Sequence, residues 1–464
     1  MDILMKDELA KSHIDLDNES VLEQTSKYVT RFNSTKVEST TQVTDEEMEL
    51  IINIGTGFTK AGFGGDDAPR ALFPSIIGRP KHPGIMVGMD QKDAYVGDEA
   101  QSKRGVMTLK YPIENGVIKN FDDFEKLIHH TLYNELRAPE GHGVVLATQP
   151  TTIHQLSKII CMFFETFHVP QLQIVSEQQC VAYANGRINA IVIDFGLTSV
   201  RVAIVINGAI LDGSLIQINV GGRDVTDYQM KLMTERGYSF TTTAERDIVR
   251  DIKEKLGYAV SDIKDALGNF KTTNEKTFTL PDGQCVTLGS ESFRINEVFF
   301  APSIIGKDCL SLQNAVAVAI SRVSPSLRSN LLANIIFSGG PACTPNLKSR
   351  LVAELNKVLP INLRSSIKVR VAPEAKYASW IGASILSDLS VSTSNYQRYL
   401  TQADYDAYGP DQCAIWANSL LWSQPPNEQK GSETEEEKKE KLGVHRIYEN
   451  YKLNLLPGET VPLV

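Results

Sequence analysis

Two short glycine-containing turns supply the residue types that bind phosphate. The first turn lies within Leu50–Phe63 (LIINIGTGFTKAGF) and carries Gly55 and Gly57. Ala190–Ile206 (AIVIDFGLTSVRVAIVI) repeats the same plan, with Gly196 in its turn. Successive backbone N–H groups in such a turn form a concave anion site, and glycine lets a phosphate approach closely. One such turn is a weak signal, because most glycine turns only reverse the chain.

The repetition makes the signal stronger. Each stretch has the pattern of a strand, a short polar turn and a second strand, which predicts a β-hairpin. Two such hairpins, about 140 residues apart and each opening an α/β stretch, predict duplicated units that clamp a phosphate chain. A third turn, Ser338–Pro341 (SGGP), follows the apolar strand Asn334–Phe337 and precedes an amphipathic helix. Its backbone is suited to approach a flat base or ribose.

A helix is predicted over Glu245–Leu256, because the preceding TTAE sequence matches a capping box. Its apolar residues recur on one face, and Arg250, Lys253 and Glu254 lie on the other. Taken alone, such charges indicate a solvated face.

Composition excludes several classes of protein. The 464 residues carry a formal net charge of −9, which disfavours direct nucleic-acid binding. The six cysteines lie far apart with no C-x-x-C pair, so neither a zinc site nor a disulfide framework is predicted. The N-terminal segment lacks the apolar core of a signal peptide, and no apolar run is long enough to span a membrane. We therefore expect an intracellular, soluble protein with no membrane partner.

Two extensions flank the predicted globular region. Residues 1–48 are rich in charged and hydroxyl side chains and predict a flexible N-terminal extension. A C-terminal extension, 411–464, contains a mixed-charge run and two apolar patches. The first patch, Ala414–Trp422, is expected either to fold back onto the domain or to dock on a partner.

Longer motifs are similar to those of one family. Ala61–Leu136, Gly222–Tyr258 and Lys376–Leu386 resemble actin closely, and shorter matches include Tyr183–Arg187 (YANGR). The resemblance covers roughly residues 49–410 and implies the actin and actin-related family. It implies an α/β fold of two RNase-H-like lobes, each with an outer subdomain, that close on ATP or ADP with Mg²⁺ or Ca²⁺. By this resemblance the smaller lobe comprises 49–184 and 378–410 (outer subdomain about 75–111), and the larger lobe 185–377 (outer subdomain about 221–307).

The resemblance also implies roles for individual residues. Glu177 and Asp194 are expected to position the attacking water and, through water, the metal ion. The nucleotide is expected to contact residues from the three turns, the capped helix and one further lysine: Asn53, Gly55, Thr56, Gly57, Lys60, Gly196, Leu197, Arg250, Lys253, Glu254, Gly339, Gly340 and Lys376. In this context Lys253 and Glu254 are expected to contact the nucleotide rather than only the solvent.

The residues that differ from the family pattern lie at the expected site of ATP hydrolysis. Actins open the first turn with Asp where this chain has Asn53, and they carry Gln where it has Glu177. Leu197 stands in place of an Asp, and Arg201 and Asn115 each stand in place of a His. Losing carboxylates weakens the hold on a hydrated cation, and losing a water-positioning group costs about 10²–10³ in rate.

The chain is therefore expected to bind nucleotide and to hydrolyse it slowly or not at all. Related sugar kinases and Hsp70 chaperones carry acidic groups in this neighbourhood, so Glu177 remains a candidate general base.

The residues expected at filament contacts give opposing indications about self-assembly. The outer loop Lys81–Ala94, which in actin inserts into the next subunit, is nearly intact. Lys307 ends the plug loop Pro302–Gly306 where actins carry an apolar residue, and Arg398 replaces an apolar residue of the groove. Charged groups are costly to bury without a partner. A long filament of this chain alone is thus not expected.

Three functions follow from the resemblance. The leading one is a nucleotide-stabilised structural subunit of an assembly in the cytoplasm or cytoskeleton, with protein partners such as actin or dynein-type complexes. The alternatives are an active ATPase that forms dynamic filaments and a nuclear actin-related subunit of a chromatin complex. An Hsp70-like chaperone or sugar kinase is disfavoured, because neither family has the 81–94 loop or the 250–258 motif in this form.

Overall fold

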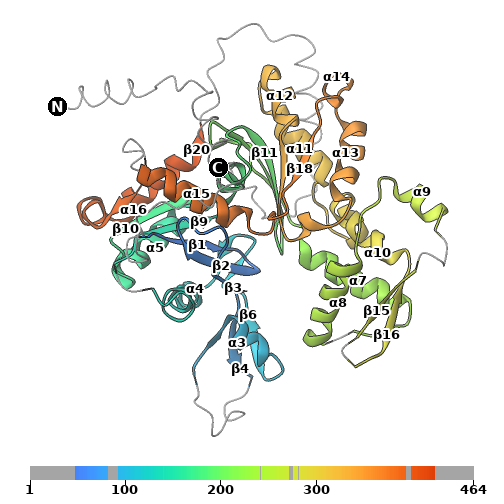
Figure 1. Cartoon of the computed structure of the whole chain (residues 1–464), viewed down its shortest axis with the longest axis horizontal. Helices are drawn as coiled ribbons and strands as arrows, with labels where there is room; N and C mark the ends of the chain where they lie inside the picture. The colour runs from blue at the N-terminus through green and yellow to red at the C-terminus, as the bar shows by residue number, and fades with distance from the viewer. Residues whose placement is uncertain are drawn as a thin grey trace, which may run out of the picture.

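A computed structural model describes residues 48–81, 92–138, 141–240, 242–270, 275–280, 282–392 and 399–423. The expectations for residues 1–47, for the centre of the outer loop, for Arg398 and for residues beyond 423 lie outside the described residues. Two α/β lobes lie side by side, each built on a mixed sheet (Figure 1). Within the described residues, no helix is both long and apolar enough to cross a membrane.

The first lobe contains a sheet with the strand order β19-β10-β9-β1-β2-β3. Strands β1 (Leu50–Ile54) and β2 (Phe58–Phe63) form the antiparallel hairpin that the sequence predicts. Strand β9 (Val144–Thr148) runs parallel to β1, and β10 (Gln171–Ser176) runs parallel to β9. The edge strands are β3 (Ala71–Pro74) and β19 (Leu400–Thr401).

Side chains of β1 alternate between two helical layers, as the two-residue period of a strand requires. Leu50, Ile52 and Ile54 pack in the core that includes α4 (Phe121–His129) and α5 (Ile153–Cys161). Ile51 packs on the opposite face, with α6 (Glu177–Ala184) and α15 (Ala378–Ser392). Asn53 shares that second face, which directs it toward the start of α6.

The second lobe repeats the plan. Strands β11 (Ala190–Phe195) and β12 (Val200–Ile206) form an antiparallel hairpin, and β17 (Ile335–Gly339) runs parallel to β11. Strand β18 (Val369–Val371) extends one side of this sheet, and β13 (Ala209–Leu211) and β14 (Ile216–Ile218) both pair with β12. The helices α11 (Leu312–Ser321), α12 (Pro325–Leu332), α13 (Leu347–Val358) and α14 (Ile361–Arg364) lie in this lobe. The predicted internal echo is therefore a duplicated hairpin plus a parallel strand.

Each lobe carries an outer part. In the first, α3 (Gly97–Ser102) packs on a small sheet of β4 (Ile77–Pro80), β5 (Tyr95–Val96) and β6 (Met107–Lys110). In the second, α7 (Gly222–Glu235) and α8 (Thr243–Leu256) accompany α9 (Ile263–Gly268), α10 (Glu291–Arg294) and the hairpin of β15 (Lys276–Thr279) and β16 (Cys285–Leu288). The capping box predicted before Glu245 is confirmed, with Thr242 as its N-cap.

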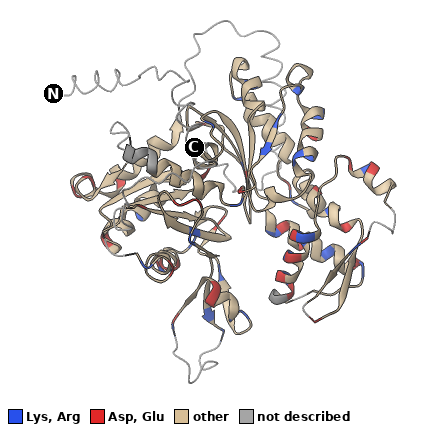
Figure 2. Ribbon diagram, viewed as in Figure 1, with Lys and Arg blue, Asp and Glu red and all other residues tan. Residues whose placement is uncertain are grey.

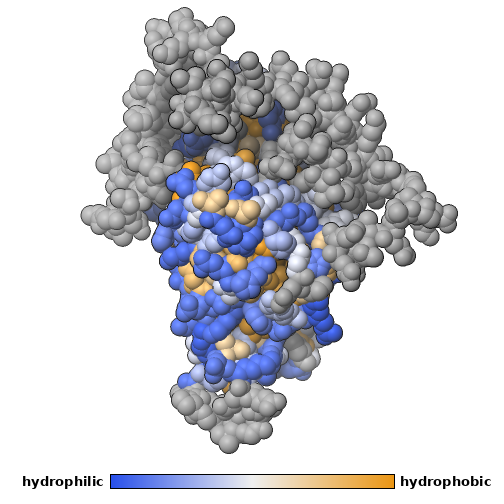
Figure 3. Space-filling model, turned by 90° about the vertical axis from the view of Figure 1, so that its left-hand side faces the viewer, coloured by the Kyte–Doolittle hydropathy of each residue, from blue (hydrophilic) through white to orange (hydrophobic). Residues whose placement is uncertain are grey.

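Helix α16 (Gln402–Leu421) consists of two helical segments that meet at a kink at the Gly409-Pro410 pair. Gly409 takes up the bend with a φ of 73°, and Cys413, Ala414 and Ala417 beyond it are buried in the first lobe's core. After the helix, Trp422 in β20 (Trp422–Ser423) pairs with β13 of the second lobe. The described part of the C-terminal extension therefore folds back onto the domain. The face of the first lobe that Figure 3 shows is mainly hydrophilic, with scattered apolar side chains.

Candidate functional site

A cavity of about 540 Å³ lies between the two lobes, where the two predicted phosphate turns face each other. It is lined by all but one of the residues assigned to the site from the sequence, from Gly55 of the first turn to Lys376 of the second lobe. The exception is Asn53, which is 1% exposed and lies behind the cavity wall. Residues drawn from segments more than 300 positions apart thus meet at one site.

The first turn is closed by a hydrogen bond from the Gly55 N–H to the Phe58 carbonyl (3.1 Å). Lys60 lies opposite Asn53 in the β1–β2 register, and its Nζ donates to Asn53 Oδ1 (3.0 Å). Burial lowers the pKa of Lys60, and the nearby carboxylates of Glu177 and Asp194 oppose that shift. Because burial removes water from the Lys60 ammonium, a bound phosphate would stabilise its charged form.

The second turn is closed in the same way, from the Gly196 N–H to the Ser199 carbonyl (2.9 Å). A Cβ at Gly196 would lie 2.8 Å from that carbonyl oxygen, so the turn needs glycine. Leu197 projects toward the first turn, where a Cβ on Gly57 would come within 3.3 Å of the Leu197 Cβ. An apolar side chain therefore stands between the two turns, where the resemblance implies a carboxylate.

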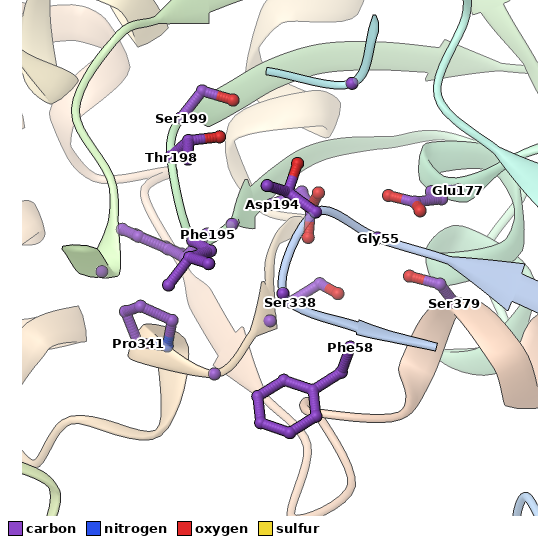
Figure 4. Close-up of a pocket in the computed structure, with 18 of the residues that line it drawn as sticks. Gly55, Phe58, Glu177, Asp194, Phe195, Thr198, Ser199, Ser338, Pro341 and Ser379 are labelled. Carbon is purple, nitrogen blue, oxygen red and sulfur yellow. The ribbon is translucent and has the colours of Figure 1, made fainter. Parts of the chain in front are cut away.

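A buried network of polar side chains joins the lobes behind the turns. The carboxyl group of Glu177 points from the first lobe toward Asp194 in the second (Figure 4). Gln149 Nε2 donates to both, to Glu177 Oε2 and to Asp194 Oδ2 (3.1 Å). Burial and the charge of Asp194 raise the pKa of Glu177 to about 7, against the opposing effects of Lys60, Arg201 and the Asn53 hydrogen bond.

Asn53 and Glu177 are direct partners. Asn53 Nδ2 donates to Glu177 Oε1 (2.8 Å) and to the Ala147 carbonyl (3.1 Å). In the family pattern these two positions carry Asp and Gln, so an amide and a carboxylate have exchanged places across one hydrogen bond. The exchange thus places the carboxyl group on α6 rather than on β1. Of the two carboxylate losses expected from the sequence, only the one at Leu197 is uncompensated.

Two further residues that differ from the family pattern, Asn115 and Arg201, are also in contact. Asn115 and Gly116, with φ of 53° and 77°, form the two-residue turn between β7 (Ile113–Glu114) and β8 (Val117–Ile118). Arg201 Nη2 of the second lobe donates to the Asn115 carbonyl (2.5 Å), and the Asn115 N–H donates to Thr198 Oγ1 (3.3 Å). A Cβ at Gly116 would collide with the guanidinium. This turn and Arg201 therefore form a contact between the two lobes at the cavity wall.

Another part of the cavity wall is built by α8 and the third glycine turn. Lys253 Nζ donates to the Gly222 carbonyl and to Thr226 Oγ1 (3.0 Å each), and burial lowers its pKa to about 8. Acidic and basic residues are concentrated on α7 and α8 (Figure 2). Gly339 has a φ of 92°, and a Cβ there would collide with the Phe195 carbonyl. At Gly339 the backbone itself therefore lines the cavity, with no side chain between it and a ligand.

The outer parts of the lobes touch as well. Gln101 Nε2 donates to Asp247 Oδ2 (2.6 Å), and Arg104 forms an ion pair with the same carboxylate (2.8 Å). Arg223 lies over the Tyr111 ring at 4.5 Å from its centroid. These contacts join α3, the residues that follow it and the β6–β7 connection to the α7–α8 pair, so the cleft is closed at the outer parts of the lobes.

The family model described as Actin matches residues 44–415. The chain belongs to the actin family. The match extends beyond the 49–410 of the sequence resemblance at both ends, and at the C-terminal end it includes the first residues of α16 after Gly409. The two duplicated lobes with a cleft between them agree with this membership and with the expected α/β actin fold.

Actin-family proteins typically bind an adenine nucleotide with a divalent cation. Among the described residues, no group of three or more His, Cys, Asp or Glu side chains is arranged to hold a metal ion. At the phosphate turns, Glu177 already accepts two amide hydrogen bonds, which leaves Asp194 as the carboxylate best placed for a metal-bound water. This donor set fits a Mg²⁺ ion bound mainly by nucleotide phosphates and water, since Mg²⁺ commonly uses only one or two protein carboxylates.

Sequence reasoning missed Gln149, although it bridges the two acidic residues of the site. It follows directly after β9, whose carboxyl end lies beside that of β1 because the two strands are parallel. Ligand sites in α/β sheets form at the carboxyl ends of parallel strands, so this placement was the available signal.

Proposed function

We propose that this actin-family chain is a structural subunit of a cytoskeletal or other multiprotein assembly, stabilised by bound ATP or ADP. It hydrolyses ATP slowly or not at all. The observation that carries the proposal is the contrast within one cavity. Both phosphate turns and Lys60 are in place, whereas the groups expected to position water and to stabilise charge are replaced at Glu177, Leu197 and Arg201.

The residues present support binding in a defined orientation. Backbone N–H groups of the two turns and Lys60 would hold the phosphates, as oriented amides and a lysine do in other phosphate sites. Lys253, Glu254, Arg250, Gly340 and Lys376 would surround the ribose and base. A divalent cation on the phosphates would supply charge neutralisation, with Asp194 holding one of its waters.

Slow hydrolysis follows from the same geometry. Both oxygens of Glu177 already accept amide hydrogen bonds, so one lone pair on each is left to orient an attacking water. Leu197 places hydrocarbon between the turns instead of a group that organises water. Loss of a preorganised group of this kind costs about 10²–10³ in rate.

The second candidate is an active ATPase that forms dynamic filaments. One observation favours it, because a carboxyl group with a pKa of about 7 is suited to general-base catalysis near neutral pH. In that case the hydrolysis rate would rise as the pH increases toward 7, as Glu177 loses its proton, and level off above it.

A single-turnover assay separates the two candidates. Native protein is loaded with ATP, freed of excess nucleotide and sampled for the bound ATP-to-ADP ratio over hours, at pH values from 6 to 8. We expect ATP to persist, with a hydrolysis rate at least about 10²-fold below that of ordinary actin filaments. A rate similar to that of actin that falls below pH 7 and is abolished by Glu177→Ala would instead establish the active ATPase.

We place the protein in the cytoplasm, at the cytoskeleton, among protein partners such as actin or dynein-type complex subunits. Support comes from the family membership and from the near-intact sequence of the outer loop. Native purification followed by identification of the companions tests this placement. Recovery only with chromatin components would favour the nuclear alternative.

A further inference from the structure

We propose that Arg201 is a phosphate-binding residue that takes over part of the charge neutralisation a divalent cation supplies, so that this chain retains nucleotide when divalent cations are removed. The inference rests on the proposed nucleotide binding and adds to it a specific ligand group and a specific cofactor requirement.

The position of Arg201 brings it to the phosphate end of the cavity. It pairs with Asp194 in the β11–β12 register, so both side chains leave the same face of the sheet. It is 7% exposed and lines the cavity. Burial lowers the pKa of Arg201, and the charges of Glu177 and Asp194 oppose that shift.

The hydrogen bonds of Arg201 leave donors for a ligand. A guanidinium has five N–H donors, and one of those on Nη2 is directed to the Asn115 carbonyl. That bond fixes the guanidinium beside the second turn, next to Thr198 and Gly116, without neutralising it. A planar guanidinium fixed by one edge is suited to bind phosphate oxygens with the other.

The charged residues that line the cavity also favour phosphate binding. Its lining contains five basic residues (Lys60, Arg201, Arg250, Lys253 and Lys376) and four acidic ones (Glu177, Asp194, Asp251 and Glu254). The lining therefore contains one more basic residue than acidic ones, and this excess attracts a polyphosphate and disfavours a free divalent cation.

Because Asn115 belongs to the first lobe and Arg201 to the second, a phosphate bound to Arg201 would also strengthen closure of the lobes. The Asn115 contact would hold the guanidinium in place while its free edge binds the ligand. Nucleotide binding and closure of the lobes would then stabilise each other without a metal ion.

Equilibrium binding of the fluorescent analogue etheno-ATP to the full chain, in Mg²⁺ and in EDTA, tests the inference. For the natural chain we expect EDTA to weaken binding by no more than about tenfold. For Arg201→Gln we expect a further loss of about 10- to 100-fold in EDTA and a smaller loss in Mg²⁺, because the cation then replaces the missing charge. Arg201→Lys should recover part of the binding in EDTA. Arg370→Gln, an exposed arginine on β18 outside the cavity, serves as the matched control.

The outcomes distinguish this inference from the proposed function. Tight binding in Mg²⁺ that collapses in EDTA would overturn the inference and leave the proposed function standing. Equal tolerance of EDTA in the natural chain and in folded Arg201→Gln would show that Arg201 is not the cause. No binding in either buffer would overturn the proposed function itself.

Discussion

Asn53→Asp alone is expected to destabilise the protein by about 2–4 kcal/mol, whereas Asn53→Asp combined with Glu177→Gln recovers more than half of that loss. In the single variant, a carboxylate replaces the amide that donates to Glu177 Oε1 from 2.8 Å. Two buried carboxyl groups then face each other and must share a proton. In the double variant, an amide at 177 again donates to a carboxylate at 53.

The recovery is expected to be incomplete for a definite reason. Asn53 also donates to the Ala147 carbonyl, and an aspartate at this position leaves that oxygen without its donor in both variants. Denaturant unfolding of the four proteins of the cycle gives the coupling between the two sites. Asn207→Asp makes the same chemical change at an exposed turn position and should stay within about 0.5 kcal/mol of the natural chain.

The single Asn53→Asp variant should also show a characteristic pH dependence. Its shared proton raises a folded-state carboxyl pKa above the unfolded value, so stability falls as the pH rises through the interval between the two values. Additive effects of the two substitutions, or equal stability of Asn53→Asp and the natural chain at neutral pH, would contradict the described contact.

Purified protein with Mg²⁺ and ATP is expected to remain in the supernatant at concentrations where actin forms filaments. Lys307 is held on its own lobe, with Nζ 2.8 Å from Asp224 Oδ1 and donating to the Asn219 carbonyl (2.6 Å). If the plug loop inserts between strands as in actin, this ammonium must give up those partners or be buried with them. A penalty of a few kcal/mol raises the assembly concentration by two or more orders of magnitude, since about 1.4 kcal/mol is tenfold.

Sedimentation of the natural chain, Lys307→Leu and Lys307→Arg tests this account of assembly. Lys307→Leu should lower the assembly concentration, and Lys307→Arg, which keeps the charge, should not. Abundant filaments of the natural chain alone would contradict the expectation. Protein that pellets only after a second component is added would support a dedicated subunit role.

The parts of the fold that follow local rules were predictable from the sequence. The two hairpins follow from their strand–turn–strand pattern, and the capped helix α8 follows from the TTAE signature. The Gly409-Pro410 pair, taken from the sequence as the end of the globular region, does interrupt α16, but a second helical segment follows it and belongs to the domain. Tertiary packing explains the difference, because the residues after the kink complete the first lobe's core.

The chemistry of the site was less predictable, because it depends on contacts between distant residues. Asn53 and Glu177 are 124 positions apart, and as separate substitutions they indicated a loss of charge at one site and a gain at another. Their hydrogen bond shows an exchange instead. Arg201 and Asn115 are likewise two unrelated replacements in the sequence, and only the structure shows that they are in contact between the lobes.

The nucleotide content of the native protein tests the central claim most directly. Undialysed protein, purified without added nucleotide, is heat-denatured, and the supernatant is separated by ion-exchange chromatography. The account predicts about one adenine nucleotide per chain, with ATP a substantial share of it because hydrolysis is slow. Folded protein that releases no adenine nucleotide would contradict the account.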